Sequence, residues 1–241
     1  MKISIVTVTY NCEDLIEKTM LSVLKQTHTN IEYIIVDGKS TDKTLDIVKQ
    51  YTLNDNRVQF FSEKDNGIYD AMNKSIKYIT GEYVLFLNAG DYLFSDNTLL
   101  HMVNCIKQKD YPDIINGNTI VYKELGIDRI ERKAFSKKML WMANTICHQS
   151  ILAKAELFIE YKFDKNFKYC ADRDWIYYMY FQRKRFAYLN EDVVFYEGNG
   201  VSSNEKIRNV IVKERYMLQK KYCKRYYYVH RAIRKLCGKE I

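Results

Sequence analysis

The segment Ile3-Ser4-Ile5-Val6-Thr7-Val8-Thr9-Tyr10-Asn11 decides the fold of this chain. Residues 3–8 are mostly β-branched, which favours a strand, and they lack the regular polar alternation of a strand with one face in water. Such a strand is buried on both faces, as in a parallel sheet that is covered by helices. Thr9, Tyr10 and Asn11 follow at its carboxyl end, where polar side chains return.

The rest of the first half alternates short β-rich runs with helical patterns. We predict strands at 3–8, 31–36, 58–61 and 83–87 and helices at 13–26, 41–51, 68–80 and 98–108. This alternation predicts an α/β fold with a mainly parallel sheet and helices on both faces. Ligands of such sheets bind at the carboxyl ends of the strands, so chemistry is expected directly after each strand.

The second half is less regular. We predict a pair of strands within 113–122, strands at 146–152, 186–189 and 193–196, a helix at 172–182 and a long basic amphipathic helix at 203–222. No repeat or low-complexity linker interrupts the chain, and Pro112 is its one proline. We therefore expect one domain over 1–202, with halves at 1–110 and 111–202, followed by a basic, Tyr-rich helical tail at 203–241.

Charge is concentrated at the end of the chain. Residues 205–241 hold twelve Lys or Arg and three Glu, so this segment carries +9 of a net charge of +8 and residues 1–204 carry −1. A nearly neutral body argues against a nucleic-acid partner. The six cysteines form no C-x-x-C pair, which predicts reduced thiols of a cytosolic protein. No apolar run is long enough to cross a bilayer, and we expect no signal peptide.

Carboxylates gather after the predicted strands. Asp37 follows the second strand and Asp91 the fourth, and each leads into a turn that contains glycine. Thr41 and Asp42 are better interpreted as helix caps. A divalent cation such as Mg²⁺ is typically held by one or two carboxylates together with substrate phosphates, so Asp91, helped by Asn88, is chemically sufficient for such a site.

Several of these segments together resemble family 2 glycosyltransferases of the bacterial envelope and exopolysaccharide type, which have the GT-A fold. The likeness covers residues 3 to about 202. It lies in residues 3–11 and in three further segments: Val36-Asp37-Gly38-Lys39-Ser40-Thr41-Asp42-Lys43-Thr44, Glu63-Lys64-Asp65-Asn66-Gly67-Ile68-Tyr69-Asp70-Ala71-Met72-Asn73-Lys74 and Leu87-Asn88-Ala89-Gly90-Asp91.

The resemblance implies a role for each matching residue. Asp91 would bind Mn²⁺ or Mg²⁺, although neighbouring positions that are usually acidic in the family are Asn88 and Gly90 here. The residues that would contact the nucleotide-sugar donor are Thr9, Tyr10, Asn11, Asp37, Asp70, Lys74, Asn88, Ala89 and Gly90.

The resemblance also implies an acidic general base that deprotonates the acceptor hydroxyl, with inversion at the anomeric carbon. Asp172 matches this base, and Asp174, on another face of the same helix, is the rival. His148, Gln149 and Trp175 would lie near the acceptor or the transferred sugar, although a lone His is as often a structural hydrogen-bonding group. Residues 199–202 resemble a loop that closes near the diphosphate, and a plain turn explains them equally well.

The implied function is an inverting hexosyl- or N-acetylhexosaminyltransferase. It would use a UDP-sugar and a lipid-linked saccharide acceptor in cell-envelope polysaccharide biosynthesis. A sugar nucleotidyltransferase would carry a Gly-rich basic loop after the first strand, whereas residues 9–14 are acidic and lack glycine. A silent sugar- or nucleotide-binding scaffold stays open because Asp91 stands alone.

The tail has two interpretations. Its cations are interleaved with apolar residues and with Tyr226-Tyr227-Tyr228, which favours an interfacial helix on anionic lipid. The alternative is a basic helix that packs one apolar stripe on the body. The first interpretation predicts a cytoplasmic protein that is peripheral on the inner face of the membrane, and the sequence leaves a homodimer open.

Overall fold

The computed structural model describes residues 1–123, 126–130, 146–197, 205–225 and 227–229. Within them, one mixed sheet has the order β3-β2-β1-β4-β8-β6-β9-β5, and β7 pairs with β6 at the side. The strands are β1 (Ile3–Thr9), β2 (Ile31–Asp37), β3 (Val58–Ser62), β4 (Tyr83–Phe86), β5 (Tyr92–Leu93), β6 (Ile114–Lys123), β7 (Gly126–Ile130), β8 (Ile151–Lys154) and β9 (Phe186–Glu197).

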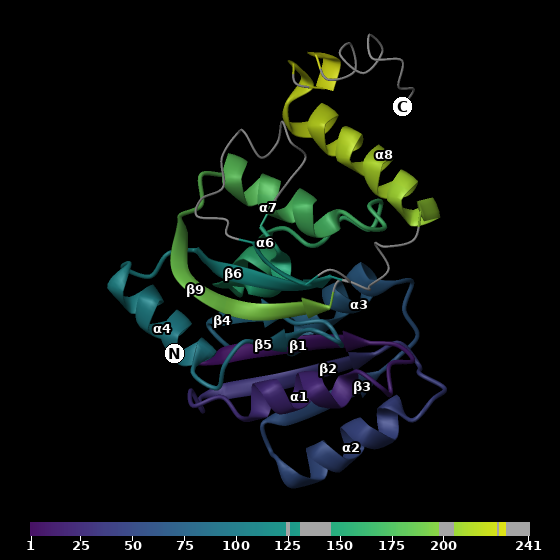
Figure 1. Cartoon of the computed structure of the whole chain (residues 1–241), viewed down its shortest axis with the longest axis vertical. Helices are drawn as coiled ribbons and strands as arrows, with labels where there is room; N and C mark the ends of the chain where they lie inside the picture. The colour runs from purple at the N-terminus through teal and green to yellow at the C-terminus, as the bar shows by residue number, and fades with distance from the viewer. Residues whose placement is uncertain (124–125, 131–145, 198–204, 226, 230–241) are drawn as a thin grey trace.

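Helices cover both faces of this sheet. They are α1 (Ile16–Leu24), α2 (Thr44–Asn54), α3 (Ile68–Ser75), α4 (Thr98–Gln108), α6 (Glu156–Glu160), α7 (Ala171–Phe181) and α8 (Glu205–Tyr222), with 3₁₀ turns η1 (Ile76–Tyr78) and η2 (His148–Ser150). Figure 1 shows α1 and α2 below the strands and α3, α6 and α7 above them, with α8 as an outer layer on α7. The α/β fold with a helix-covered mixed sheet is confirmed.

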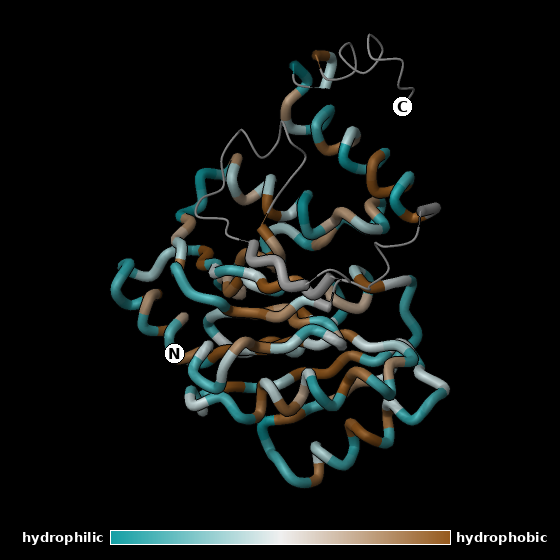
Figure 2. The backbone as a smooth tube through the Cα atoms, viewed as in Figure 1, coloured by the Kyte–Doolittle hydropathy of each residue, from teal (hydrophilic) through white to brown (hydrophobic). Residues whose placement is uncertain are grey.

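The β1 strand explains why two cores form. Ile3 and Ile5 point into the core beneath α1 and α4, whereas Val6 and Val8 point into the core with α3 and α7. Successive strand residues face opposite sides, so a strand with apolar side chains on both sides joins the two cores. Figure 2 shows the same feature as hydrophobic segments along the central strands.

The parallel half of the sheet agrees with the prediction. β1 pairs in parallel with both β2 and β4, and β2 pairs in parallel with β3. Two helices begin later than predicted, α1 at Ile16 and α2 at Thr44, because the residues between strand and helix form polar turns. α3 and α4 begin at the predicted residues. Asp42 accepts a hydrogen bond from the Thr44 N–H in such a turn (3.0 Å), but the N-cap of α2 is Lys43 and not Thr41 or Asp42.

The second half differs from the prediction in three places. The two strands expected within 113–122 are one strand, β6, which pairs with β7, β8 and β9. The strands expected at 186–189 and 193–196 are one strand, β9, whose register against β6 shifts next to Gly117. A Cβ atom at Gly117 would collide with Val193 and lie 2.9 Å from the Glu191 carbonyl oxygen, so glycine permits this bulge. Finally, β7 and α6 were not predicted, and neither was β5 in the first half.

The described part of the tail packs on the body. Glu214, Leu218 and Gln219 of α8 are buried, and Leu218 belongs to the same core as α7. The opposite face of α8 is exposed and includes Lys213 and Met217. No helix within the described ranges has the length and apolarity that a membrane crossing requires.

Candidate functional site

The ends of β1, β2 and β3 meet in register at one edge of the sheet. Thr9 pairs with Asp37, and Asp37 pairs with Ser62 on the next strand. β4 lies on the other side of β1, so its axis is about 10 Å from that of β2, two strand spacings away. The polar residues that follow these strands are therefore brought to a common edge.

Asp37 organises the loop that follows β2. Its buried carboxylate accepts hydrogen bonds from the Lys39 N–H (3.0 Å), the Ser40 N–H (3.1 Å) and the Ser62 hydroxyl (2.6 Å). The Ser40 hydroxyl also donates to it at 2.5 Å. These bonds occupy most of the acceptor capacity of the carboxylate. Asp37 thus fixes the loop beside Thr9, and a bound ligand would reach it only by displacing a hydroxyl.

The loop after β1 joins this network and leaves one aromatic ring exposed. Asn11 has a left-handed backbone with φ of +47°, which asparagine tolerates, and its side-chain oxygen accepts the Thr41 N–H at 2.8 Å. Tyr10 is 63% exposed. A Cβ atom at Gly38 would collide with the Asp65 carboxylate and lie 3.4 Å from the Tyr10 ring, so these three residues adjoin one another.

The turn after β4 carries Asn88, Ala89, Gly90 and Asp91. The Asp91 N–H donates to the Asn88 carbonyl oxygen at 3.0 Å, which closes the turn. Gly90 has φ of +99°, a conformation that side-chain-bearing residues rarely adopt, and its N–H donates to the Thr19 hydroxyl at 2.9 Å. The turn holds the Asp91 side chain in a buried position.

Gln149 meets Asp91 from η2. Its Nε2 donates to Asp91 Oδ2 at 2.9 Å, and its Oε1 accepts from the Cys147 thiol at 2.7 Å. Burial, assisted by the Asp91 charge, raises the pKa of Cys147 to about 12, so this group stays a thiol and a donor. The thiol therefore fixes the orientation of the Gln149 amide, with its N–H groups toward the carboxylate.

A second chain of contacts links the β4 turn to α7. His148 Nε2 lies 3.2 Å from Asn88 Nδ2, and His148 Nδ1 lies 3.1 Å from Asp172 Oδ2. Because the Asp172 carboxylate is an acceptor, the Nδ1 of His148 carries the proton of this contact. The other carboxylate oxygen of Asp172 accepts the Tyr69 hydroxyl at 3.0 Å and the Arg173 N–H at 2.8 Å.

These contacts keep Asp172 ionised. Burial by itself raises its pKa, but the His148 hydrogen bond and charge, together with Arg173 and Tyr69, outweigh burial and hold the pKa below the ordinary value for aspartate. The Tyr69 phenol shows the opposite effect: burial and the neighbouring carboxylate raise its pKa well above the ordinary value. Asp172 is therefore a carboxylate and Tyr69 a neutral donor near neutral pH.

Asp70 and Lys74 lie on α3, where they contact each other and hold neighbouring segments of the chain. Asp70 accepts Lys165 Nζ at 2.9 Å and the Asn66 N–H at 3.0 Å, and Lys74 Nζ lies 3.6 Å from it. The hydrogen bond from Lys165 is the main cause of the lowered pKa of Asp70. Burial alone would raise this pKa, but its effect is smaller. Lys74 also donates to the Lys64 carbonyl oxygen at 2.6 Å, so the pair fixes the start of α3.

Asp174 and Trp175, which the sequence placed at the site, are buried in other contacts. The Asp174 carboxylate is fully buried and accepts hydrogen bonds from Lys221 Nζ (2.8 Å), Tyr222 (2.8 Å) and Tyr161 (2.7 Å). Trp175 is 2% exposed, and its ring stacks on Phe158 with centroids 4.5 Å apart. Helical geometry separates Asp172 from Asp174 by about 200°, so one faces the site while the other faces α8. Neither Asp174 nor Trp175 offers an accessible surface to an acceptor.

The residues at the β4 turn fit a hard divalent cation. Among the residues that the structure describes, no group donates a hydrogen bond to the buried Asn88 Oδ1, and unsatisfied buried acceptors of this kind are uncommon. An amide oxygen in the same turn as Asp91 is a suitable ligand type. Within the described ranges no three His, Cys, Asp or Glu side chains gather around one metal position. The fit is therefore to a cation that takes most of its ligands from a bound diphosphate and water.

Sequence reasoning missed several residues of this site. Tyr69 belongs to the buried stripe of α3, and its hydroxyl partner lies 103 positions away in the chain. Lys165 contacts Asp70, 95 positions away, which no local pattern indicates. Cys147 contacts Gln149, only two positions later. The sequence placed His148 and Gln149 at the start of a strand, whereas they form the 3₁₀ turn η2 before β8. The loop expected at 199–202 lies outside the described residues.

A sequence comparison gives an independent view of the chain. The model of the family described as "Glycosyl transferase family 2" matches residues 4–150. A Mycobacterium bovis protein described as "PGL/p-HBAD biosynthesis glycosyltransferase" is 32% identical over 160 residues, which cover 64% of this chain and 60% of that protein. The match thus spans about three fifths of the relative's length. The "Putative teichuronic acid biosynthesis glycosyltransferase TuaG" of Bacillus subtilis is 43% identical over 90 residues, 37% of this chain and 36% of TuaG.

Solved structures with a similar fold bind nucleotide-sugars. S. aureus TarS 1–349 in complex with UDP-GlcNAc matches with a TM-score of 0.73 at 21% identity, over 92% of this chain and 68% of that one. The mannosyltransferase PcManGT from Pyrobaculum calidifontis, in complex with GDP-Man and Mn²⁺, matches with a TM-score of 0.69 at 16% identity, over 89% of this chain and 63% of its own. At these identities the likeness establishes the fold.

Proposed function

The chain belongs to glycosyl transferase family 2, and from this membership we propose that it transfers a sugar from a nucleoside-diphosphate sugar to an acceptor hydroxyl. The observation that carries the proposal is the juxtaposition of two acidic centres. Asp91 meets Gln149 after β4, and Asp172 meets His148, the residue next to Gln149. Sugar transfer from a diphosphate requires a carboxylate that binds the metal and a base that activates the acceptor. The 3₁₀ turn η2 contacts a candidate for each, Asp91 and Asp172.

The donor nucleotide is proposed to lie over the ends of β1, β2 and β3. The exposed Tyr10 ring and the Asp65 carboxylate adjoin Gly38, whose missing side chain lets the carboxylate approach, and we propose that a base or ribose would lie against the Tyr10 ring. We propose that the nucleotide lies against Thr9, Asn11 and Asp37. Asn11 and Asp37 also hold the loop after β2 in place by hydrogen bonds. Asp70 and Lys74 are proposed to act from α3 by fixing the segment 64–67, in which Asp65 adjoins Gly38. UDP is the nucleotide that we propose, since two of the structural neighbours hold UDP-GlcNAc or UDP.

Asp91, with the Asn88 amide oxygen, is proposed to hold Mn²⁺ or Mg²⁺. A cation at this position would neutralise the diphosphate and stabilise the charge on the departing nucleoside diphosphate. Ala89 and Gly90 present only backbone and a methyl group, so they let the diphosphate approach the turn closely. Gln149 orients the Asp91 carboxylate by donating to Oδ2.

Asp172 is proposed to be the general base. It is held as a carboxylate by His148 and Tyr69 and lies at the first turn of α7. It would take the proton of the acceptor hydroxyl as that oxygen attacks the anomeric carbon, on the face opposite the diphosphate. The product would then have inverted configuration. A base of this kind contributes about 10²- to 10⁴-fold to the rate.

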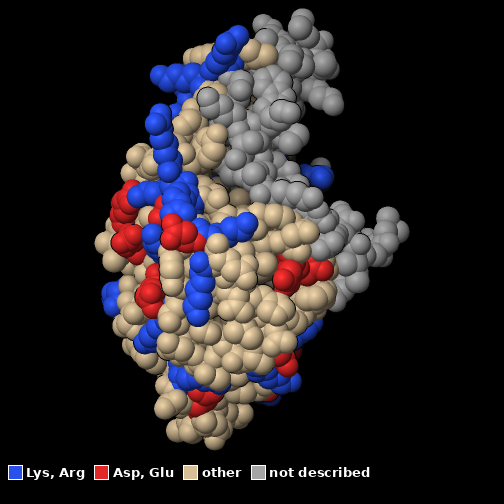
Figure 3. All heavy atoms as spheres, turned by 90° about the vertical axis from the view of Figure 1, so that its left-hand side faces the viewer, with Lys and Arg blue, Asp and Glu red and all other residues tan. Residues whose placement is uncertain are grey.

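The acceptor is proposed to be a saccharide of a cell-envelope glycan, carried on a lipid. The relatives in Mycobacterium bovis and Bacillus subtilis are described by their parts in PGL/p-HBAD and teichuronic acid biosynthesis. The exposed face of α8 supports a membrane location, since cations and apolar residues alternate along one stripe; these are Val210, Lys213, Met217 and Lys220. Figure 3 shows Lys and Arg side chains gathered on the upper part of the molecule, where α8 lies. This face would lie on anionic lipid at the inner side of the membrane.

A silent sugar- or nucleotide-binding scaffold is the second candidate, because Asp91 is the one carboxylate of its turn. The experiment that separates the two functions is a screen of UDP-, GDP- and dTDP-sugars with Mn²⁺ or Mg²⁺, read as slow release of nucleoside diphosphate. We expect one donor to be hydrolysed, with the release abolished by EDTA and by Asp91→Ala. Binding of a donor without any release, with and without added saccharide acceptors, would favour the scaffold and overturn the proposal.

A further inference from the structure

The segment that leads into α7 depends on a residue of α8. α7 begins at Ala171, and Cys170 at its N-cap position makes no side-chain capping bond. The two residues just before this cap both contact Glu214. The Lys168 N–H donates to Glu214 Oε1 at 2.7 Å, and the Tyr169 N–H donates to Glu214 Oε2 at 2.9 Å. Glu214 is 5% exposed, so a buried carboxylate receives both groups with both of its oxygens. Such charge-assisted bonds are about twice as strong as neutral ones.

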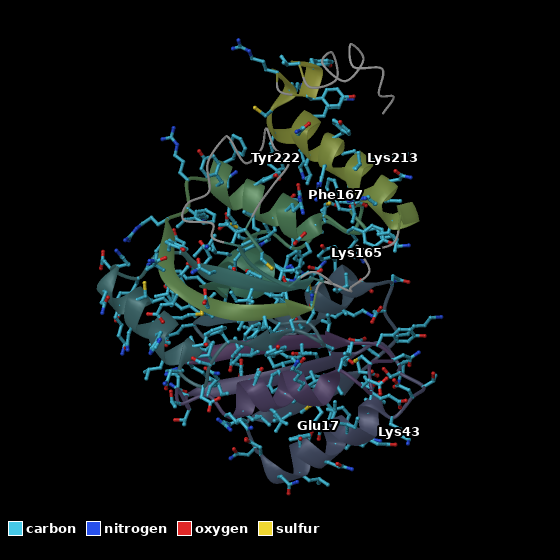
Figure 4. The ribbon with its side chains drawn as sticks, viewed as in Figure 1. Glu17, Lys43, Lys165, Phe167, Lys213 and Tyr222 are labelled. Atoms are coloured by element: carbon cyan, nitrogen blue, oxygen red, sulfur yellow. The ribbon has the colours of Figure 1, made fainter. Side chains whose placement is uncertain are left out.

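A second contact joins the same two helices after the cap. Lys221 Nζ and the Tyr222 hydroxyl, both from the last turn of α8, each lie 2.8 Å from Asp174 Oδ1. Lys221 also lies over the Phe167 ring, 5.7 Å from its centroid. Figure 4 shows Phe167 and Tyr222 in the space between α7 and α8. The α8 helix therefore contacts the chain on both sides of residue 172.

The position of Asp172 follows from these two contacts. Asp172 lies three residues after Tyr169, which contacts Glu214, and two residues before Asp174, which contacts Lys221. Both separations are shorter than one helical turn of about 3.6 residues. A shift of the 168–170 segment is thus passed directly to the Asp172 carboxylate. Because a misplacement of about 1 Å at a reacting group can cost about 10²-fold in rate, a small loss of this support matters for catalysis.

We propose that Glu214 is a positioning residue, which acts through Asp172 by holding the start of α7. This inference rests on the proposed role of Asp172 as the general base. It assigns α8 to the catalytic unit, whereas the sequence alone separated a domain at 1–202 from a tail at 203–241. Glu214 touches neither the β4 turn nor the strand ends in the contacts described above, so its effect is expected on the acceptor side alone.

Glu214→Gln is the test variant, since it keeps the size of the side chain and replaces one acceptor oxygen with an NH₂ group that faces an N–H donor. Glu156→Gln is the matched control, because Glu156 is exposed on α6. Turnover of UDP-GlcNAc or the donor found by the screen is measured for wild type, Glu214→Gln, Asp172→Asn and the double variant, with the affinity for UDP from calorimetry. Hydrogen exchange of the amides at 168–173 reports the local structure without catalysis.

We expect Glu214→Gln to lower kcat about 10- to 100-fold with the UDP affinity and the KM for the donor unchanged. Exchange at 168–173 should quicken, and Glu156→Gln should match wild type in every measurement. In the Asp172→Asn background, Glu214→Gln should cause no further loss, since a residue that acts through another is silent without it. An equal loss in that background, or wild-type turnover of Glu214→Gln, overturns the inference alone. Full turnover of Asp172→Asn overturns the base assignment, and the inference with it.

Discussion

The imidazole Nδ1 of His148 lies 3.1 Å from Asp172 Oδ2, and this contact joins the strand edge of the sheet to the helix that covers it. On its other side, the His148 ring contacts Asn88 in the turn that also carries Asp91. A shift of η2 would therefore move both acidic centres together. His148 is thus well placed to keep the proposed base and the proposed metal site at a fixed separation.

Removal of His148 should make the base harder to ionise. In His148→Ala, the hydrogen bond and the positive neighbour are lost while burial remains, so the pKa of Asp172 rises. Because the base acts as a carboxylate, the acid limb of kcat/KM should move to higher pH than in wild type. A pH profile from pH 4 to 8 measures this shift. His101→Ala, which removes a histidine that pairs with Glu191 on α4 and β9, is the control and should leave the limb in place; an unmoved limb in His148→Ala would count against the contact.

Asp91 should make nucleotide binding depend on the cation. We expect UDP to bind at least about tenfold more tightly with Mn²⁺ than with EDTA, equivalent to about 1.4 kcal/mol of cation-mediated binding. Asp91→Asn keeps the shape and removes the charge, so the difference should vanish. Titration calorimetry of UDP in both conditions measures it. Asp96→Asn, at an exposed position five residues later, should behave as wild type; a Mn²⁺ effect that survives in Asp91→Asn would exclude this ligand.

Asp174 should matter for stability more than for turnover. Asp174→Asn leaves the Lys221 ammonium without its buried partner, which should lower the free energy of unfolding by about 3 kcal/mol. Turnover of the folded protein should fall at most about tenfold, against 10²- to 10⁴-fold for loss of the base. Urea denaturation and kcat below the transition measure both quantities. The opposite pattern, with intact stability and abolished turnover, would make Asp174 the base.

Glu32 should stabilise the fold in a pH-dependent way. Burial raises its pKa, but Lys2, Ser4 and Thr80 outweigh burial and lower it from 4.5 to about 2. A pKa depressed by folding stabilises the protein above the unfolded value, and this stability is lost as pH falls toward the folded value. The difference in unfolding free energy between wild type and Glu32→Gln should be about 3 kcal/mol at pH 7. It should shrink between pH 4.5 and about 2, and a difference constant over this range would contradict the prediction.

The sequence was sufficient for the parallel half of the fold. The β-branched runs that become β1, β2 and β4 have local signals, and Asp37 and Asp91 follow strand ends that any such sheet brings to one edge. The same pattern could not show that the Asp37 carboxylate also accepts a hydrogen bond from Ser62, which lies 25 residues further along the chain.

The acceptor side was less predictable because its contacts are between distant segments. A helical pattern placed Asp172, Asp174 and Trp175 on α7 but did not say which of them faced the site. That choice is made by Tyr161 and Tyr222, which surround Asp174, and by Phe158, which stacks on Trp175. Likewise, the continuity of β9 depends on Gly117 in another strand, where the absence of a side chain admits a bulge.

The most direct test of the account is the turnover of Asp172→Asn against wild type, with the affinity for UDP and Mn²⁺ measured on the same samples. The carboxylate that faces His148 and Tyr69 should be required for proton removal and not for donor binding. We therefore expect kcat to fall about 10²- to 10⁴-fold at an unchanged UDP affinity. Turnover within about threefold of wild type would contradict the account, because a base of this strength cannot be removed at so small a cost.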